Sequence, residues 1–227
     1  MISFGTSGNK QIRYPSTLVQ NQTKWSFSCW VNILANSTLD VYQTIFLAGS
    51  FWNFYYRRDT GRIYFYVPWT TGDGFWYITA PSLNTLNHFV VTYDGTSNSN
   101  TPIIYMNGAS QSVTRELQPT GSLPTGSSNF YIGDEVYEPC FKIQDVKVYN
   151  RVLSAIEALE LYSSKSLINN FSGIIFQDKL ISAKDCASFD GTTLAASNTF
   201  LDEVSNAVGV PTNNLVIGYA DTFQIYK

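Results

Sequence analysis

The stretch from Phe141 to Tyr162, FKIQDVKVYNRVLSAIEALELY, joins a strand pattern directly to a helix pattern. In its first half, Val146 and Val148 fall on one face of the expected strand. Phe141 and Ile143 fall on the opposite face, as the two-residue period of a strand requires. A late strand that leads into one short helix restricts the chain to few architectures, because the other residues give strand patterns almost throughout.

The second half of this stretch contains the start signals of a helix over residues 154–164. Ser154 lies three residues before Glu157, which is the spacing of a capping box, where each side chain bonds the free backbone N–H of the other residue. Leu153 lies just before the cap and can pack against Ala158 as a hydrophobic staple. Helical spacing then predicts an apolar face that consists of Ile156, Leu159 and Tyr162.

The rest of the chain favours an all-β fold. Charged residues make up 14% of the sequence and aromatic residues 15%, a composition that suits twisted sheets. Asn107-Gly108 predicts a hairpin between strands at 103–106 and 110–117. About a dozen short strands at regular spacing predict a β-sandwich. The other main strands are expected near residues 24–34, 42–48, 51–57, 62–67, 75–79 and 86–93.

The segment from Asp145 to Ser154, DVKVYNRVLS, resembles the closing phrase of laminin-G-like modules, which belong to the concanavalin A-like class of jelly rolls. Four further phrases of this family occur before it in the usual order: KWSFSCWVNI at 24–33, NHFVVTYDG at 87–95, IIYMNG at 103–108 and NFYIG at 129–133. The resemblance implies an all-β, concanavalin A-like jelly-roll β-sandwich with one short helix near residues 154–164.

The resemblance also suggests a division of the chain. It covers residues 1–165, which we expect to form the laminin-G-like sandwich. Residues 166–227 match no phrase of the family. We expect them to form a C-terminal appendage or arm that packs on the sandwich or on a neighbouring chain.

Charge and hydropathy exclude several kinds of partner. The net charge of −3 gives no basic field, so we expect no nucleic acid as a partner. No run approaches the roughly 18 apolar residues of a membrane span. The strand pattern begins at Met1, so we expect no signal peptide.

The cysteines do not indicate a network of disulfide bridges or a metal site. Cys29, Cys140 and Cys186 are odd in number and far apart, which predicts neither a disulfide scaffold nor a zinc site. One Cys29–Cys140 or Cys140–Cys186 bridge remains open. Cys29 alternates with apolar strand residues and is expected to be a small core hydrophobe.

No catalytic constellation is evident. His88, the single histidine, lies in an expected strand without the signature of a nucleophile and an orienting acid. A glycosidase needs two carboxyl groups about 5–5.5 Å apart, or a wider pair for inversion. The nearest candidates, Asp134, Glu135 and Glu138, form a loop pattern. We therefore expect no catalytic residue and no enzyme activity.

A calcium site is the one cofactor that the resemblance brings into question. Family members can hold calcium at the rim of the sandwich through Asp side chains and backbone carbonyls, because the ion takes several oxygen ligands. The candidate ligands are Asp94, Asp134 and Glu135. Turn chemistry explains Asp94-Gly95 equally well. No other cofactor is expected.

The segment from Phe51 to Tyr77 contains twelve aromatic residues. Strand alternation cannot direct all of them inward. Trp69 and Trp76 flank a glycine-rich loop, so one or both are candidates for exposure. A tyrosine- and phenylalanine-rich core, a protein interface and sugar stacking all remain open. The candidate contacts to a glycan or a partner are Trp52, Trp69, Trp76, Tyr77, Arg57 and Arg58.

Three functions follow from these patterns. The first is a non-catalytic structural or interaction module, with other protein chains of a larger assembly as its partners. Low charge, the unmatched tail and the missing signal peptide favour a virion surface protein of a capsid, decoration or tail, made in the cytoplasm. The second is a carbohydrate-binding adhesion module for a cell-surface glycan. The third is a glycosidase.

Overall fold

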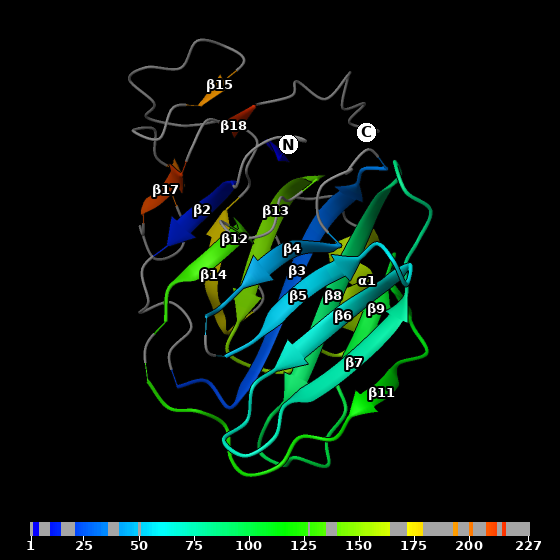
Figure 1. Cartoon of the computed structure of the whole chain (residues 1–227), viewed down its shortest axis with the longest axis vertical. Helices are drawn as coiled ribbons and strands as arrows, with labels where there is room; N and C mark the ends of the chain where they lie inside the picture. Colours follow the sequence, from blue (N-terminus) through cyan, green and yellow to red (C-terminus); the bar gives the residue numbers. More distant parts are fainter. Residues whose placement is uncertain are drawn as a thin grey trace.

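Strand pairing arranges the chain in two antiparallel sheets that face each other (Figure 1). The computed structural model describes residues 2–4, 10–14, 21–35, 41–49, 51–126, 128–134, 140–163, 172–178, 193–194, 200–201, 208–212 and 215–216. Sheet A contains, in spatial order, β10 (Ala109–Ser110), β9 (Ile103–Met106), β8 (Leu86–Asp94), β3 (Lys24–Ile33), β13 (Phe141–Tyr149), β1 (Ile2–Phe4), β18 (Leu215–Val216) and β15 (Thr193–Leu194), and β14 (Ile174–Asp178) also pairs with β13. Sheet B contains β11 (Thr114–Leu117), β7 (Gly74–Thr79), β6 (Arg62–Val67), β5 (Asn53–Arg57), β4 (Tyr42–Leu47), β12 (Phe130–Asp134), β2 (Lys10–Tyr14), β17 (Val208–Thr212) and β16 (Phe200–Leu201).

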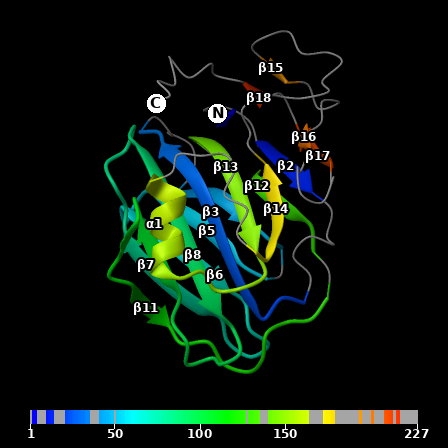
Figure 2. The ribbon, with the colours of Figure 1, turned by 180° about the vertical axis from the view of Figure 1, so that it is seen from behind.

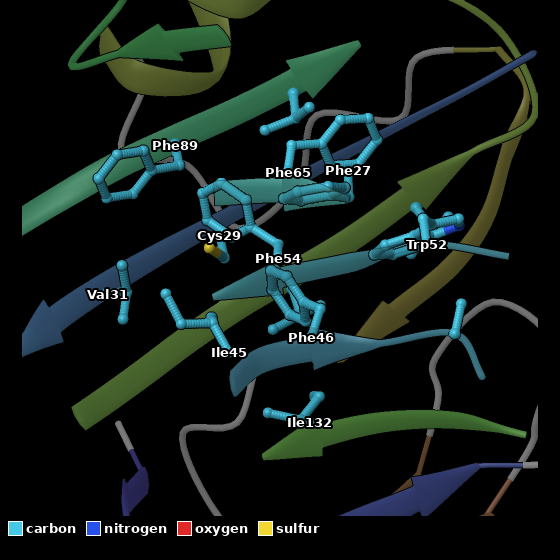
Figure 3. Packing of buried hydrophobic residues seen from close by; sticks show 14 of the residues in the cluster. Phe27, Cys29, Val31, Ile45, Phe46, Trp52, Phe54, Phe65, Phe89 and Ile132 are labelled. Carbon is cyan, nitrogen blue, oxygen red and sulfur yellow. The ribbon is translucent and has the colours of Figure 1, made fainter. Parts of the chain in front are cut away.

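The main core lies between the two sheets and is strongly aromatic (Figure 3). Phe27 of β3 stacks on Trp52, with ring centroids 5.0 Å apart and planes within 7° of parallel. Phe27 also meets the edge of Phe54 from β5 at 5.0 Å. Cys29 is fully buried in the same core, as the alternation along its strand predicts. The inward half of each aromatic strand of sheet B therefore builds the core, and the other half faces outward.

A bulge in β13 changes the faces that simple alternation predicts. Gln144 pairs with Trp30 and Lys147 pairs with Ser28, so three steps along β13 match two along β3. Asp145 lies at this irregularity with a φ of 50°. The extra residue shifts the alternation by one position. The prediction that two pairs of apolar residues occupy opposite faces is therefore wrong, because all four reach the main core: Phe141, Ile143, Val146 and Val148.

Helix α1 (Ala155–Ser163) lies on the outer face of sheet A (Figure 2). The predicted capping box is confirmed: the Ser154 N–H donates to Glu157 Oε2 at 2.8 Å, and the Glu157 N–H donates to Ser154 Oγ at 3.3 Å. The predicted staple residues, Leu153 and Ala158, are both buried. They belong to a second apolar cluster, separate from the main core, that contains Val90, Tyr105, Tyr149, Leu153, Ala158 and Leu161.

The predicted apolar face of the helix is wrong at two of its three positions. Ile156 is 70% exposed and Leu159 is 51% exposed, whereas Leu161 is buried. Tyr162 does face sheet A, where its ring packs on Trp30. The turn that leads into α1 sets which face of the helix points toward sheet A. Ser26 Oγ donates to the Arg151 carbonyl at 2.7 Å and accepts from the Leu153 N–H at 3.0 Å, which fixes the turn before the helix.

The hairpin at Asn107-Gly108 forms, but its return strand is shorter than predicted. Both turn residues have positive φ, as a tight hairpin turn requires. Only Ala109–Ser110 pairs with β9. The chain then crosses to the other sheet, where β11 pairs with β7 at the free edge of sheet B. One predicted strand over 110–117 is therefore two strands in different sheets.

Segments beyond residue 165 join both sheets. β14 pairs with β13, and Phe176 of β14 is buried in the main core. Phe176 meets the edges of Tyr14 at 4.8 Å and Phe130 at 5.1 Å. β17 pairs with β2 in sheet B. The division at residue 165 stays a prediction.

Two further expectations concern cysteines and membranes. Cys29 and Cys140 are both buried and free, so no bridge joins them, and Cys186 lies outside the described residues. Within the part of the chain that the structure describes, no helix has the length and apolar character needed to cross a membrane.

Candidate functional site

Aromatic side chains form a row across the outer face of sheet B, which is the face that does not contact sheet A. The register places Tyr55 of β5 opposite Tyr64 of β6, and Tyr64 opposite Tyr77 of β7. Tyr42 of β4 pairs with Arg57 in the adjacent cross-strand row, and its ring centroid lies 5.7 Å from that of Tyr55. Directly paired residues share one face of a sheet, so the row follows from the register. We call this surface the tyrosine face; its members are Tyr42, Tyr55, Arg57, Arg62, Tyr64, Tyr66, Phe75 and Tyr77.

The rings at the centre of the tyrosine face stand side by side. The centroids of Tyr55 and Tyr64 are 5.3 Å apart and their planes lie within 6° of parallel. Tyr64 and Tyr77 follow at 5.5 Å. Tyr55 and Tyr64 are 8% and 2% exposed, whereas Tyr42 and Tyr77 are half-buried. The central rings therefore turn their faces toward each other, and the outer tyrosines remain accessible.

Two arginines lie in the next cross-strand row of the same face. Arg57 pairs with Arg62 across β5 and β6. The Arg57 guanidinium donates to both carboxylate oxygens of Asp59, at 2.9 and 3.0 Å. The Arg62 guanidinium lies 4.0 Å from the centroid of the Tyr77 ring, which is a cation–π contact. A hydrogen bond with the Tyr64 side chain raises the pKa of Arg62 further above its ordinary value.

A third row adds apolar and hydroxyl groups. Asn53 pairs with Tyr66 and Tyr66 pairs with Phe75, with ring centroids of the last two 4.7 Å apart. Both rings are half-buried. Burial and the adjacent Asp73 raise the pKa of Tyr66 to about 12. Burial and neighbouring tyrosines also raise the pKa of Tyr55. Both hydroxyls stay protonated at neutral pH and can donate as well as accept hydrogen bonds.

The structure places three predicted contact residues inside the protein. Trp52, Trp69 and Trp76 are 2%, 7% and 0% exposed and belong to the main core. The expectation that Trp69 or Trp76 is exposed is therefore wrong. The loop after β6 is pinned by backbone bonds from Thr70 to Ser122 and from Thr71 to Thr120, which holds the chain next to Trp69 against the sandwich. None of the three indole faces is available to a sugar in this conformation.

The other predicted contacts lie outside the core. Tyr77 and Arg57 belong to the tyrosine face. Arg58 is exposed just after β5, where its N–H donates to the Val41 carbonyl at 2.9 Å. Their role in binding stays a prediction.

The candidate calcium ligands do not come together among the described residues. Asp94 forms an ion pair with Lys24 at 2.8 Å and accepts from the Thr96 N–H at 3.0 Å, which is turn chemistry. Asp134 is 7% exposed, and Glu135 and Glu138 lie outside the described residues. In the described part of the chain, no group of three His, Cys, Asp or Glu side chains could hold a metal ion.

His88 is buried beneath α1. Its Nε2 lies 2.9 Å from Ser28 Oγ, within hydrogen-bonding distance, whereas Nδ1 has no partner among the described residues. Burial, and secondarily the charge of Lys147, lowers the pKa of His88 to about 3. His88 and Ser28 are 1% and 0% exposed, so this pair is not accessible to a substrate.

Most residues of the tyrosine face were not predicted as contact residues from the sequence. The aromatic segment over residues 51–77 was evident, but the inward and outward faces of its strands were not assigned. The turn at Asp59-Thr60-Gly61 sets the pairing of β5 with β6, so counting outward from it would have aligned Tyr55 with Tyr64. The residues that were missed are Tyr42, Tyr55, Arg62, Tyr64, Tyr66 and Phe75.

Comparison with known families agrees with this architecture. The profile described as the concanavalin A-like lectin/glucanases superfamily, of the laminin G type, matches residues 5–158. The chain belongs to this superfamily. The resemblance of the closing phrase is thereby confirmed, as is the predicted β-sandwich. No curated protein matches the chain by sequence.

Solved structures of low sequence identity share the fold. A carbohydrate-binding protein from Bacteroides ovatus, so described provisionally, has 15% identity and a TM-score of 0.62, over 97% of this chain and 61% of that chain. The receptor-binding domain of botulinum neurotoxin C/D mosaic serotype has 17% identity and a TM-score of 0.51, over 63% and 37%. A heptameric SAP-like pentraxin from Limulus polyphemus has 12% identity and a TM-score of 0.55, over 92% and 94%. The chain thus spans less than two thirds of the first two proteins.

Proposed function

We propose that this chain is a non-catalytic carbohydrate-binding module whose tyrosine face contacts the glycan. The observation that carries the proposal is the row of tyrosines bordered by Arg57 and Arg62 on adjacent strands. Rigid strands hold these side chains, so little conformational entropy is lost when a ligand binds. Membership of the superfamily and the similarity to a protein described as carbohydrate-binding support the proposal.

The orientation of the rings defines how the face binds. Parallel packing occupies the faces of Tyr55 and Tyr64, and Arg62 covers the ring of Tyr77. The face therefore offers tyrosine hydroxyls and guanidinium N–H groups to sugar hydroxyls, with Phe75 as an apolar contact. Carboxylates border this face: Asp59 pairs with Arg57, Asp73 interacts with Tyr66, and Glu116 lies near Tyr55 and Arg62.

Glycan-array screening followed by calorimetry tests this proposal. We expect Tyr77→Phe and Tyr66→Phe each to weaken binding about 2- to 10-fold, the value of one neutral hydrogen bond. Both variants retain the ring, so they separate hydrogen bonding from stacking. Leu159→Ala on α1, on the opposite side of the molecule, is the matched control and should bind as the unaltered chain does. A blank array, or unchanged affinity in both tyrosine variants, would contradict the proposal.

The second candidate is the assembly module that the sequence favoured. Ile156 and Leu159 lie three residues apart on α1 and are 70% and 51% exposed, and neighbouring exposed apolar side chains are typical of contacts between proteins. None of the similar structures described above is a virion protein, so the virion assignment stays a proposal. Sedimentation over a concentration series tests it: self-association that Ile156→Ser with Leu159→Ser abolishes would favour this function, and a monomer at all concentrations would count against it.

A further inference from the structure

The space between α1 and sheet A contains a buried polar group of residues that the glycan proposal does not use. Its members come from two strands that flank β3 and from β3 itself. The His88 ring packs on Trp30 at 4.9 Å and on Tyr162 of α1 at 6.1 Å. Lys147 Nζ lies 2.5 Å from Asp145 Oδ2, and both side chains are almost fully buried.

A proton on His88 would have no acceptor in this arrangement. Ser28 Oγ already contacts Nε2, and Nδ1 has no partner among the described residues. The charge that acts on the ring is that of Lys147, which repels an imidazolium. Asp145 pairs with Lys147 through Oδ2, its Oδ1 has no partner among the described residues, and it has no resolved effect on His88. The other side chains against the ring, Trp30 and Tyr162, are uncharged at acid pH, so His88 stays neutral while α1 is docked.

Helix α1 can be released without breaking the main core. Its contacts with sheet A form a separate apolar cluster of six residues. Once α1 and Tyr162 move away, His88 gains solvent on one side and can accept a proton. We propose that α1 is an acid-released cover of the outer face of sheet A, and that His88 is the proton-binding group that drives its release.

The size of the effect follows from linkage. His88 has a pKa of about 3 with α1 docked, against the ordinary histidine value of 6.5 when it is solvated. Opening is therefore favoured as the pH falls below the solvated value, because only the open form binds the proton. From about pH 7 to about pH 5, the opening equilibrium of α1 should rise about 25-fold. Glu157 contributes little in this range, since its pKa of about 2 and its ordinary value of 4.5 both lie below about pH 5.

Amide hydrogen exchange of α1, corrected for the intrinsic pH dependence of exchange, tests the proposal. We expect the opening equilibrium of residues 155–163 to rise about 25-fold over this range. Amides of β3 should stay protected, because the main core remains closed. His88→Gln, which retains a hydrogen-bonding side chain but cannot titrate, should remove most of the rise. An unchanged rise in His88→Gln, or equal opening of α1 and β3 at every pH, would overturn the proposal.

The native chain provides a second measurement if His88→Gln fails to fold. His88 is the only histidine, so its imidazole signal in a tag-free protein needs no assignment by mutation. We expect that signal to stay that of a neutral ring in the docked form at about pH 5. Titration near the ordinary histidine pKa with α1 still protected would overturn the proposal.

Discussion

Asp145 determines which side chains lie beneath α1. Its positive φ allows the bulge in β13, and Asp is one of the residues that tolerate this conformation. The bulge directs Val146 inward and Lys147 outward, where Lys147 meets the Asp145 carboxylate at 2.5 Å. One backbone irregularity therefore creates both an uninterrupted apolar inner face and a buried ion pair on the outer face.

Removing one member of this ion pair should cost far more than removing both. Lys147→Met leaves the Asp145 carboxylate buried without its partner, and we expect a loss of about 3–5 kcal/mol in the free energy of unfolding. The double variant Lys147→Met with Asp145→Asn should recover most of that loss, because no isolated charge remains. Urea denaturation measures both values. Equal stability of the single and double variants would show that the pair is not coupled.

At the scale of a single element, hydrogen bonds and an ion pair among neighbouring residues stabilise the N-terminus of α1. Glu157 accepts from the Ser154 N–H and forms an ion pair with Arg151. The hydrogen bond from Arg151, followed by bonds from Ser154, lowers the pKa of Glu157 to about 2 from its ordinary value of 4.5. Because the folded-state pKa is depressed, this network stabilises the protein above about pH 4.5 and loses its contribution as the pH falls toward 2.

Replacing the cap tests this network directly. We expect Ser154→Ala to lower the stability of α1 by about 1 kcal/mol, since Glu157 N–H loses its side-chain acceptor. Ser154→Thr keeps a hydroxyl that can accept from the Glu157 N–H and donate to the Glu157 carboxylate, so it is the matched control. Amide exchange of residues 155–163 at neutral pH reports the difference. An Ala variant as well protected as the Thr variant would mean that packing of the helix, not the cap, holds its first turn.

At the scale of the whole molecule, distant parts of the chain complete one core. β13 is paired by β1 along Phe141–Ile143 and by β14 along Val146–Tyr149, so the edge away from β3 is covered by an N-terminal strand and by a strand that follows α1. Phe176 of β14 is fully buried against Tyr14 and Phe130. At least one strand beyond residue 165, β14, therefore forms part of the sandwich itself.

Truncating this contribution should destabilise the sandwich. Phe176→Ala should cost about 3–5 kcal/mol of unfolding free energy, as expected for a large buried ring. Ile175→Ala, at a partly buried position on the same strand, should cost less. Urea denaturation of both variants provides the comparison. A Phe176→Ala variant with unaltered stability would contradict the placement of β14 in the core.

Sequence alone determined the features that depend on neighbouring residues. The fold class follows from strand alternation and from phrases such as Asp145–Ser154, and the helix start follows from Ser154 and Glu157. These interactions join residues only a few positions apart, so they can be predicted from the order of residues along the chain. The buried state of Cys29 followed from the same local alternation.

The tertiary structure decided which face each residue occupies, because that depends on contacts between distant segments. The bulge at Asp145 reversed part of β13, and the tether from Ser26 turned Ile156 away from sheet A. Pinning of the loop after β6 kept Trp69 in the core. Only cross-strand register brought Tyr55, Tyr64 and Tyr77 into one row, since a shift of one residue would have sent them inward.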